Sequence, residues 1–170
     1  THWLDRLASR AMAVIAIGTC ATWGGVPAAH GNPTGAMSLD EYLGANFRGL
    51  GGLPVINIPG CAPPGDNFTE TLEYLLLHIA QQVPLELDKW RRPGWLYAET
   101  THSQPPRVAY LPSTAYHNEL IVECRVPTHA WMNRMGGCAN VGGACNGCTM
   151  PGFPDDYLST SANVLQESAD

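Results

Sequence analysis

The sequence contains few charged residues, and most of its charge is negative. Charged residues make up 14% of its 170 residues, below the usual quarter, and the formal net charge is −6. Because nucleic-acid binding requires clustered Lys and Arg, this balance argues against a nucleic-acid partner. A chain that exposes so little charge often covers much of its surface with a protein partner.

Long apolar runs and a leader sequence are also missing. No stretch of about eighteen apolar residues occurs, so no transmembrane helix is predicted. No signal peptide opens the chain, and Thr1 leads directly into a helical pattern. We therefore expect that an N-terminal part is missing, and that the protein is cytoplasmic or associated with the cytoplasmic side of a membrane.

Two apolar runs and two helical patterns predict a parallel α/β sheet. The runs at residues 11–18 and 54–60 are short, continuous and closed by Gly, as buried parallel strands are. Helices are predicted at residues 2–10 and 68–82, and Asp66 or Asn67 is the expected N-cap of the second helix. This order of helix, strand, strand and helix is typical of an α/β fold.

One cysteine follows each predicted strand. Cys20 lies two residues after Gly18, which closes the first strand, and Cys61 directly follows Gly60, which closes the second. Ligands of parallel sheets bind beyond the carboxyl ends of the strands. We therefore expect Cys20 and Cys61 at the same edge of the sheet.

The second half of the chain is rich in loops and holds four of the six cysteines. A region with so little regular structure needs a partner or a staple such as a metal centre. The predicted domains are therefore residues 1–83, which carry Cys20 and Cys61, and the loop-rich region 84–170.

Several kinds of site could use these cysteines. Disulfides suit small secreted domains, and a lone cysteine is usually a core thiol. Zinc commonly binds a C-x-x-C turn, and the C-terminal cysteines could close a zinc site; they are Cys124, Cys138, Cys145 and Cys148. Thiolates also hold iron–sulfur clusters, and the many flanking glycines would admit such a bulky group. The spacing alone leaves zinc and iron–sulfur equally open.

Three long motifs occur in the order of one known family. They are GTCATWGGVPAAHGNPTGA (residues 18–36), INIPGCAPPGDNF (56–68) and CNGCTMPGFPD (145–155). Together they resemble the small, electron-transfer subunit of nickel–iron hydrogenases. Residues 87–102 resemble the start of that family's cluster-binding region, and residues 124–148 are similar to its high-affinity, actinobacterial-type branch.

The resemblance implies a fold and a set of partners. The fold would be a flavodoxin-like parallel sheet with an incomplete N-terminal part, followed by a loop-rich iron–sulfur cluster-binding region. A large subunit would hold the nickel–iron centre and oxidise dihydrogen, and a quinone, cytochrome or other carrier would accept the electrons. A higher oligomer of heterodimers is expected. This chain would hold no catalytic residue, and no Ser/His/Asp or paired-carboxylate signature suggests one.

Cys20 and Cys61 would be ligands of the proximal cluster, a 4Fe–4S centre near the active site, by the same resemblance. The family supplies two more proximal ligands from an N-terminal loop that this sequence does not contain. Trp23, near Cys20, is expected either to screen the cluster from water or to pack in the core.

A medial cluster is implied at Cys145 and Cys148, with Cys124 as the first ligand. Cys138 is additional to the family's commonest pattern, so the centre could be 3Fe–4S with three ligands or 4Fe–4S with four. Gly pairs bracket Cys138, and glycines also stand close to Cys145 and Cys148. It could therefore replace Cys124, which would then belong to the distal site.

The sequence departs from the family at the distal cluster. His102 matches the family's His ligand, but Pro105 stands three residues later, where the family has Cys. No other cysteine occurs before Cys124, so the presence of a distal cluster is left open.

Two other classes of protein fit parts of the pattern. A cluster-bearing subunit of the NADH–quinone oxidoreductase type has a similar sheet with a cluster at the same edge. Its C-terminal region lacks these cysteines, and the ATWGG loop also argues against it. A zinc-stapled structural protein is the second alternative, and it would be colourless.

Overall fold

The computed structural model describes residues 2–97 and 147–155 of the chain. A two-stranded parallel sheet forms its core, with β1 (Val14–Ile17) paired in register with β2 (Val55–Ile58). All four side chains of β2 are buried, as expected for an apolar run covered on both faces. The two predicted strands and the α/β class are therefore confirmed.

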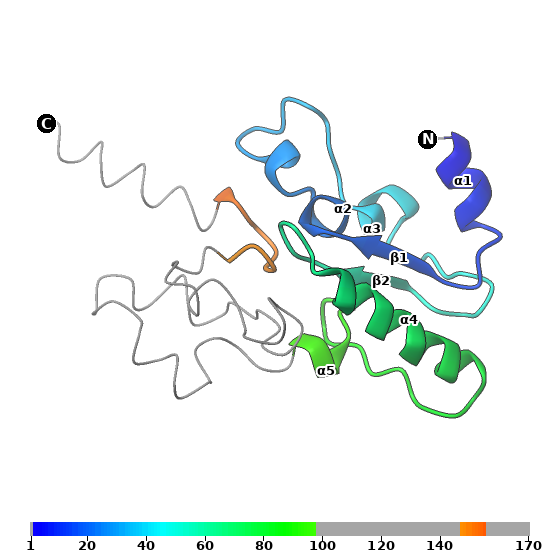
Figure 1. Ribbon diagram of the computed structural model, residues 1–170. Helices are drawn as coiled ribbons and strands as arrows, with labels where there is room; N and C mark the ends of the chain where they lie inside the picture. The colour runs from blue at the N-terminus through cyan, green and yellow to red at the C-terminus, as the bar shows by residue number, and fades with distance from the viewer. Residues whose placement is uncertain (1, 98–146, 156–170) are drawn as a thin grey trace, which may run out of the picture.

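Helices flank the two strands in Figure 1, where α4 runs alongside β2 and the short helices α2 and α3 lie beyond β1. A further helix, α1, precedes β1, and the Tyr42 hydroxyl of α3 donates a 2.8 Å hydrogen bond to the Asp5 carboxylate of α1. The helices are α1 (His2–Ala8), α2 (Thr19–Trp23), η1 (Val26–Ala28), α3 (Leu39–Leu43), α4 (Gly65–Ile79) and α5 (Gly94–Tyr97).

The start of α4 differs from the prediction. The helix begins at Gly65, with Pro64 as its N-cap, and no side chain caps it. Pro64 enters the helix from an extended conformation, and Asn67 is fully buried in the first turn. The predicted cap at Asp66 or Asn67 is therefore wrong, because both residues already lie inside the helix.

The long segment between the strands contains three short helices, α2, η1 and α3, that the sequence pattern did not predict. The helix α3 begins with a capping box: the Ser38 hydroxyl accepts a 3.1 Å hydrogen bond from the Glu41 N–H, and the Glu41 carboxylate accepts one of 2.7 Å from the Ser38 N–H. The S-x-x-E spacing of this motif is visible in the sequence. Two backbone donors at the start of a five-residue helix are satisfied in this way.

Residues 84–97 lie against β2. The Asn57 N–H donates to the Arg91 carbonyl at 2.9 Å, and the Tyr97 hydroxyl donates to the Pro59 carbonyl at 2.8 Å. These bonds attach the start of the predicted loop-rich region to the strand. The predicted domain boundary between residues 83 and 84 stays a prediction.

None of the helices within residues 2–97 and 147–155 is both long and apolar enough to cross a membrane.

Ser38→Ala should lower the free energy of unfolding by about 1 kcal/mol, because it removes the side-chain half of the capping box. Chemical denaturation followed by circular dichroism measures this change. Ser9→Ala is the matched control, since the exposed Ser9 hydroxyl bonds only to carbonyls of its own helix, and its effect should stay within about 0.5 kcal/mol. Equal effects of the two substitutions would contradict the role assigned to the capping box.

Candidate functional site

Cys20 and Cys61 both lie at the carboxyl edge of the sheet. The Thr19 N–H donates to the Gly60 carbonyl at 3.1 Å, and the Gly60 N–H donates back to the Thr19 hydroxyl at 3.0 Å. The residues directly before the two cysteines are thus bonded to each other. The prediction that Cys20 and Cys61 share one edge is confirmed.

A third predicted ligand joins the same edge from far along the chain. The Thr19 hydroxyl donates a hydrogen bond to the carbonyl of Cys148. In Figure 1, residues 147–155, drawn in orange, lie beside the end of the sheet at which the arrow of β1 points. Three cysteines are therefore attached to one backbone junction: Cys20, Cys61 and Cys148.

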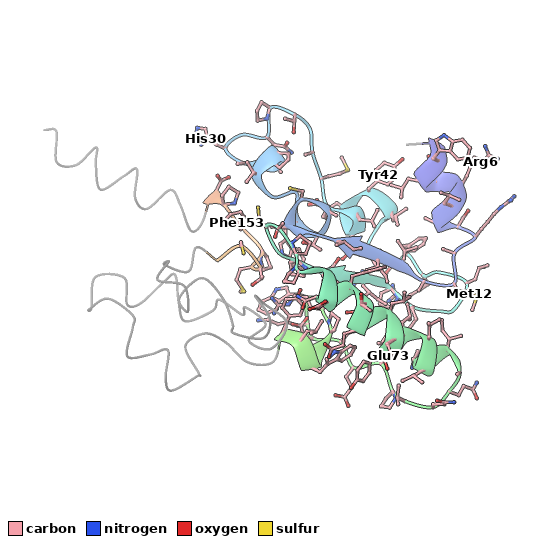
Figure 2. The ribbon with its side chains drawn as sticks, in the orientation of Figure 1. Arg6, Met12, His30, Tyr42, Glu73 and Phe153 are labelled. Atoms are coloured by element: carbon pink, nitrogen blue, oxygen red, sulfur yellow. The ribbon has the colours of Figure 1, made fainter. Side chains whose placement is uncertain are left out.

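The segment 147–155 is held by several further contacts. The Trp23 indole donates to the Thr149 carbonyl at 3.4 Å, and the Asp155 carboxylate accepts a 2.8 Å bond from the His30 N–H. Figure 2 labels His30 and Phe153 in this part of the molecule. Trp23 thus has a hydrogen-bonding role at this contact, and whether it also screens a cluster from water stays a prediction.

Apolar packing supports these bonds. Cys148, Met150 and Phe153 form a buried cluster, and Trp90 packs against it. The side chain of Cys148 is therefore largely removed from water, in contrast to the exposed Cys20 and Cys61.

A fully buried arginine joins this segment to residues 84–97. Arg92 forms an ion pair with Asp88, whose carboxylate lies 2.8 Å from the guanidinium, and it donates to the Thr149 carbonyl at 3.2 Å. The Met150 sulfur accepts a further contact at 3.8 Å. A buried charge is tolerated only when it is paired and hydrogen-bonded, and Arg92 meets this condition.

Aromatic rings complete the surroundings of Arg92. Its guanidinium lies 4.4 Å from the ring centre of Trp90 and 4.8 Å from that of Tyr97, which adds cation–π attraction in a dry site. Burial raises the pKa of the Tyr97 hydroxyl well above its usual range, and the charge of Arg92 opposes this rise. Tyr97 therefore stays neutral and can keep donating its hydrogen bond to Pro59.

The donor set at the sheet edge fits an iron–sulfur cluster. The described cysteines form no disulfide, and thiolates are the usual ligands of such clusters. A Cβ at Gly25 would stand 3.0 Å from the Cys20 sulfur, so the glycine keeps this sulfur clear of a neighbouring side chain. Within the described ranges, no three His, Cys, Asp or Glu side chains are grouped closely enough to hold a metal ion. Any cluster at Cys20 and Cys61 therefore needs further ligands.

A cavity within the described residues lies elsewhere and offers little chemistry. It has a volume of about 510 Å³ and is lined by the end of α4 and nearby loops. Among the described residues that line it, His78 is the only ionisable one, and its Nδ1 is hydrogen-bonded to the Val83 carbonyl at 3.0 Å. The cysteine edge, rather than this cavity, is the candidate site.

The remaining predicted ligands lie outside the described residues; they are Cys124, Cys138, Cys145 and His102. Sequence reasoning missed Thr19 and Arg92, whose partners are distant in the sequence. The spacing of Asp88 and Arg92 gives no usable sequence signal, because opposite charges four residues apart are expected to pair on helices and residues 88–92 form a turn.

Comparison with known proteins distinguishes between the families that share such a sheet. A family profile described as the NADH ubiquinone oxidoreductase 20 Kd subunit matches residues 1–75. The periplasmic NiFe hydrogenase small subunit 1 of Nitratidesulfovibrio vulgaris is 32% identical over 168 residues, covering 86% of this chain and 50% of that protein. The Hydrogenase-2 small chain of Escherichia coli is 42% identical over 104 residues, or 61% of this chain and 25% of that protein.

A solved structure extends the likeness to nearly the whole chain. An actinobacterial-type NiFe-hydrogenase from Ralstonia eutropha superposes with a TM-score of 0.78 at 40% identity, covering 98% of this chain and 59% of that one. This chain belongs to the small-subunit family of nickel–iron hydrogenases.

Membership of this family accounts both for the sheet region and for the cysteine-containing region that follows it in this hydrogenase small-subunit homologue. The sheet half also matches the NADH ubiquinone oxidoreductase profile, whereas the hydrogenase relatives align well beyond residue 75. The chain spans between a quarter and about half of the length of these curated relatives.

Arg92→Met should lower the free energy of unfolding by about 3 kcal/mol, because it leaves the Asp88 carboxylate largely buried without its counter-ion. Urea titration of the purified chain measures this loss. Arg48→Met is the control, since the exposed Arg48 donates only to carbonyls of its own loop, and its effect should stay within about 0.5 kcal/mol. An equal loss of unfolding free energy in both variants would show that Arg92 does not join residues 84–97 to the segment 147–155.

Proposed function

We propose that this chain is the electron-relay subunit of a nickel–iron hydrogenase. Electrons from dihydrogen oxidation in a large subunit would pass through iron–sulfur clusters to an acceptor such as a quinone or cytochrome. The attachment of Cys20, Cys61 and Cys148 to one junction at the sheet edge carries this proposal. An electron relay needs cluster ligands held at fixed separations, and this arrangement supplies them.

Cys20 and Cys61 would hold the proximal 4Fe–4S cluster. Their exposed thiols lie at the edge where parallel α/β folds bind ligands. Gly25 bears no side chain that would stand against the Cys20 sulfur, which supports a bulky ligand at this position. When bound, such a cluster takes up and releases one electron at a potential that burial and hydrogen bonds to sulfur adjust.

Cys148 would hold the medial cluster together with Cys145 and either Cys124 or Cys138. The burial of Cys148 against Met150, Phe153 and Trp90 would exclude water from one side of that cluster. A 3Fe–4S centre is favoured if three of these thiolates bind, and a 4Fe–4S centre if all four do. A distal cluster at His102 remains the least supported part of the proposal.

A large-subunit partner is supported by the exposed apolar surface. Large hydrophobic side chains at least 36% exposed occur on α1, α4 and the intervening loops, and they include Trp3, Leu7, Val26, Met37, Leu50, Leu72, Leu76 and Ile79. Contiguous apolar surface often marks a protein interface, and Leu72, Leu76 and Ile79 share one face of α4 by their spacing. A higher oligomer of heterodimers and the location in the cell stay predictions.

A cluster-bearing subunit of the NADH–quinone oxidoreductase type is the second candidate, because its family profile matches residues 1–75. The segment 147–155, docked on Trp23 and Arg92, favours the hydrogenase instead, since it carries one of the cysteines that distinguish the two families. A zinc-stapled protein is distinguished by metal analysis.

Cys20→Ser and Cys61→Ser should each remove one cluster, and the double variant should lose no more iron than either single variant. The physical reason is that losing either ligand releases the same cluster, so removing both ligands releases no additional iron. Cys148→Ser should remove a different cluster, so its iron loss should add to that of Cys20→Ser. Iron, sulfide and zinc analysis of the purified complex, with visible absorption, measures these losses.

A colourless, zinc-containing wild-type protein would overturn the proposed function. Additive iron loss in the Cys20→Ser/Cys61→Ser double variant would instead show that the two cysteines do not share a cluster.

Cys138→Ala should change the electron paramagnetic resonance signal of the medial cluster if Cys138 is an iron ligand. The Gly pairs on both sides of Cys138 motivate this expectation, because glycines also stand close to Cys61, Cys145 and Cys148. Cys124→Ala is the matched comparison. An unaltered medial signal in Cys138→Ala, with a lost signal in Cys124→Ala, would identify Cys124 as the third ligand.

A further inference from the structure

The Thr19 hydroxyl forms two hydrogen bonds in a buried three-way junction. Thr19 is 2% exposed, and its hydroxyl accepts from the Gly60 N–H at 3.0 Å while it donates to the Cys148 carbonyl. A hydroxyl has one proton to donate. Because the Gly60 bond occupies an acceptor position, the proton remains available for Cys148.

This junction connects the two predicted cluster sites through the Thr19 hydroxyl and its two hydrogen-bond partners. Thr19 directly precedes Cys20, Gly60 directly precedes Cys61, and the third partner is the backbone of Cys148 itself. The first two cysteines are the proposed proximal ligands, and the third is a proposed medial ligand. One side-chain oxygen therefore lies between the two ligand sets.

The surrounding backbone leaves this junction little freedom to move. The Thr19 N–H is bonded to the Gly60 carbonyl at 3.1 Å, and the Gly18 N–H is bonded to the Ile58 carbonyl at 2.8 Å. A Cβ on Gly60 would stand 2.7 Å from the Pro63 Cα, so the chain is closely packed here. The two strand ends are thus tied closely to each other. The bond to Cys148 is the one that joins them to the segment 147–155 through Thr19, beside the contacts of Trp23, His30 and Arg92 with that segment.

We infer that Thr19 is a positioning residue that fixes Cys148 relative to Cys20 and Cys61, and so sets the separation of the proximal and medial clusters. The inference rests on the proposed function for the identity of the two clusters. The rate of electron transfer between two centres falls steeply with their separation, so a fixed link between the ligand sets matters for a relay.

Three variants isolate the contribution of the hydroxyl. Thr19→Val replaces it with a methyl group, and Thr19→Ser keeps it. Thr22→Val is the matched control, because Thr22 is 1% exposed on the same helix and its hydroxyl donates only to the Thr19 carbonyl, at 3.3 Å. Of the three, only Thr19→Val removes both bonds of the hydroxyl, the one to the Cys148 carbonyl and the one from the Gly60 N–H.

Hydrogen exchange followed by mass spectrometry measures the link without reference to any cluster. In Thr19→Val, exchange in residues 147–155 should accelerate by about fivefold or more, as expected when a buried hydrogen bond is lost. Exchange in Thr19→Ser and Thr22→Val should stay within about twofold of the wild type. Unchanged exchange in Thr19→Val, or an equal change in Thr22→Val, would overturn the inference.

A second readout tests the consequence for the clusters. Thr19→Val should retain the wild-type iron and sulfide content, while the magnetic interaction between the two reduced clusters, seen by electron paramagnetic resonance, should change. An unaltered interaction would show that Thr19 does not set the separation. Wild-type protein without iron would overturn the proposed function instead, and the hydrogen-exchange result would still decide the role of Thr19 in the fold.

If Thr19→Val does not fold, hydrogen exchange in the wild-type protein alone tests the inference. The Met150 N–H and the Gly60 N–H should then exchange at similar rates, because the link makes them parts of one cooperative unit. Much faster exchange at Met150 would overturn the inference.

Discussion

The cysteine end of this structure depends on the buried ion pair between Arg92 and Asp88. A guanidinium removed from water is tolerated only when its donors find acceptors, and Arg92 finds them on two segments. Asp88 lies in residues 84–97, whereas the Thr149 carbonyl lies in the segment that carries Cys148. Satisfying one charge therefore requires both segments to be in place, which makes their packing mutually dependent.

The same requirement explains the aromatic residues around Arg92. Trp90 and Tyr97 exclude water from the charge and attract it through their ring faces. Trp90 also packs on the buried cluster of Cys148, Met150 and Phe153. The electrostatic and apolar parts of this region thus support the same geometry, and neither is satisfied without the other.

The sequence predicted the features that depend on local pattern. Continuous apolar runs predicted β1 and β2, and the cysteines placed directly after them predicted a shared edge. The predicted N-cap of α4 was wrong, because the helix begins directly after Pro64, earlier than the polar residues suggested. Thr19 and Arg92 could not be predicted, because their roles depend on partners that only the tertiary fold brings close. The residues outside the described ranges keep their predicted roles as hypotheses.

The link at Thr19 also orders the assembly of the site during folding. The hydrogen bond from Gly60 to Thr19 closes a separation of 41 residues, whereas the bond to Cys148 closes one of 129. Loop-closure entropy makes the longer closure costlier by about 1 kcal/mol. The edge that carries Cys20 and Cys61 is therefore favoured to form first, and the segment with Cys148 then docks onto a finished surface. In such an order the early-formed strand ends act as a template for the late-arriving segment.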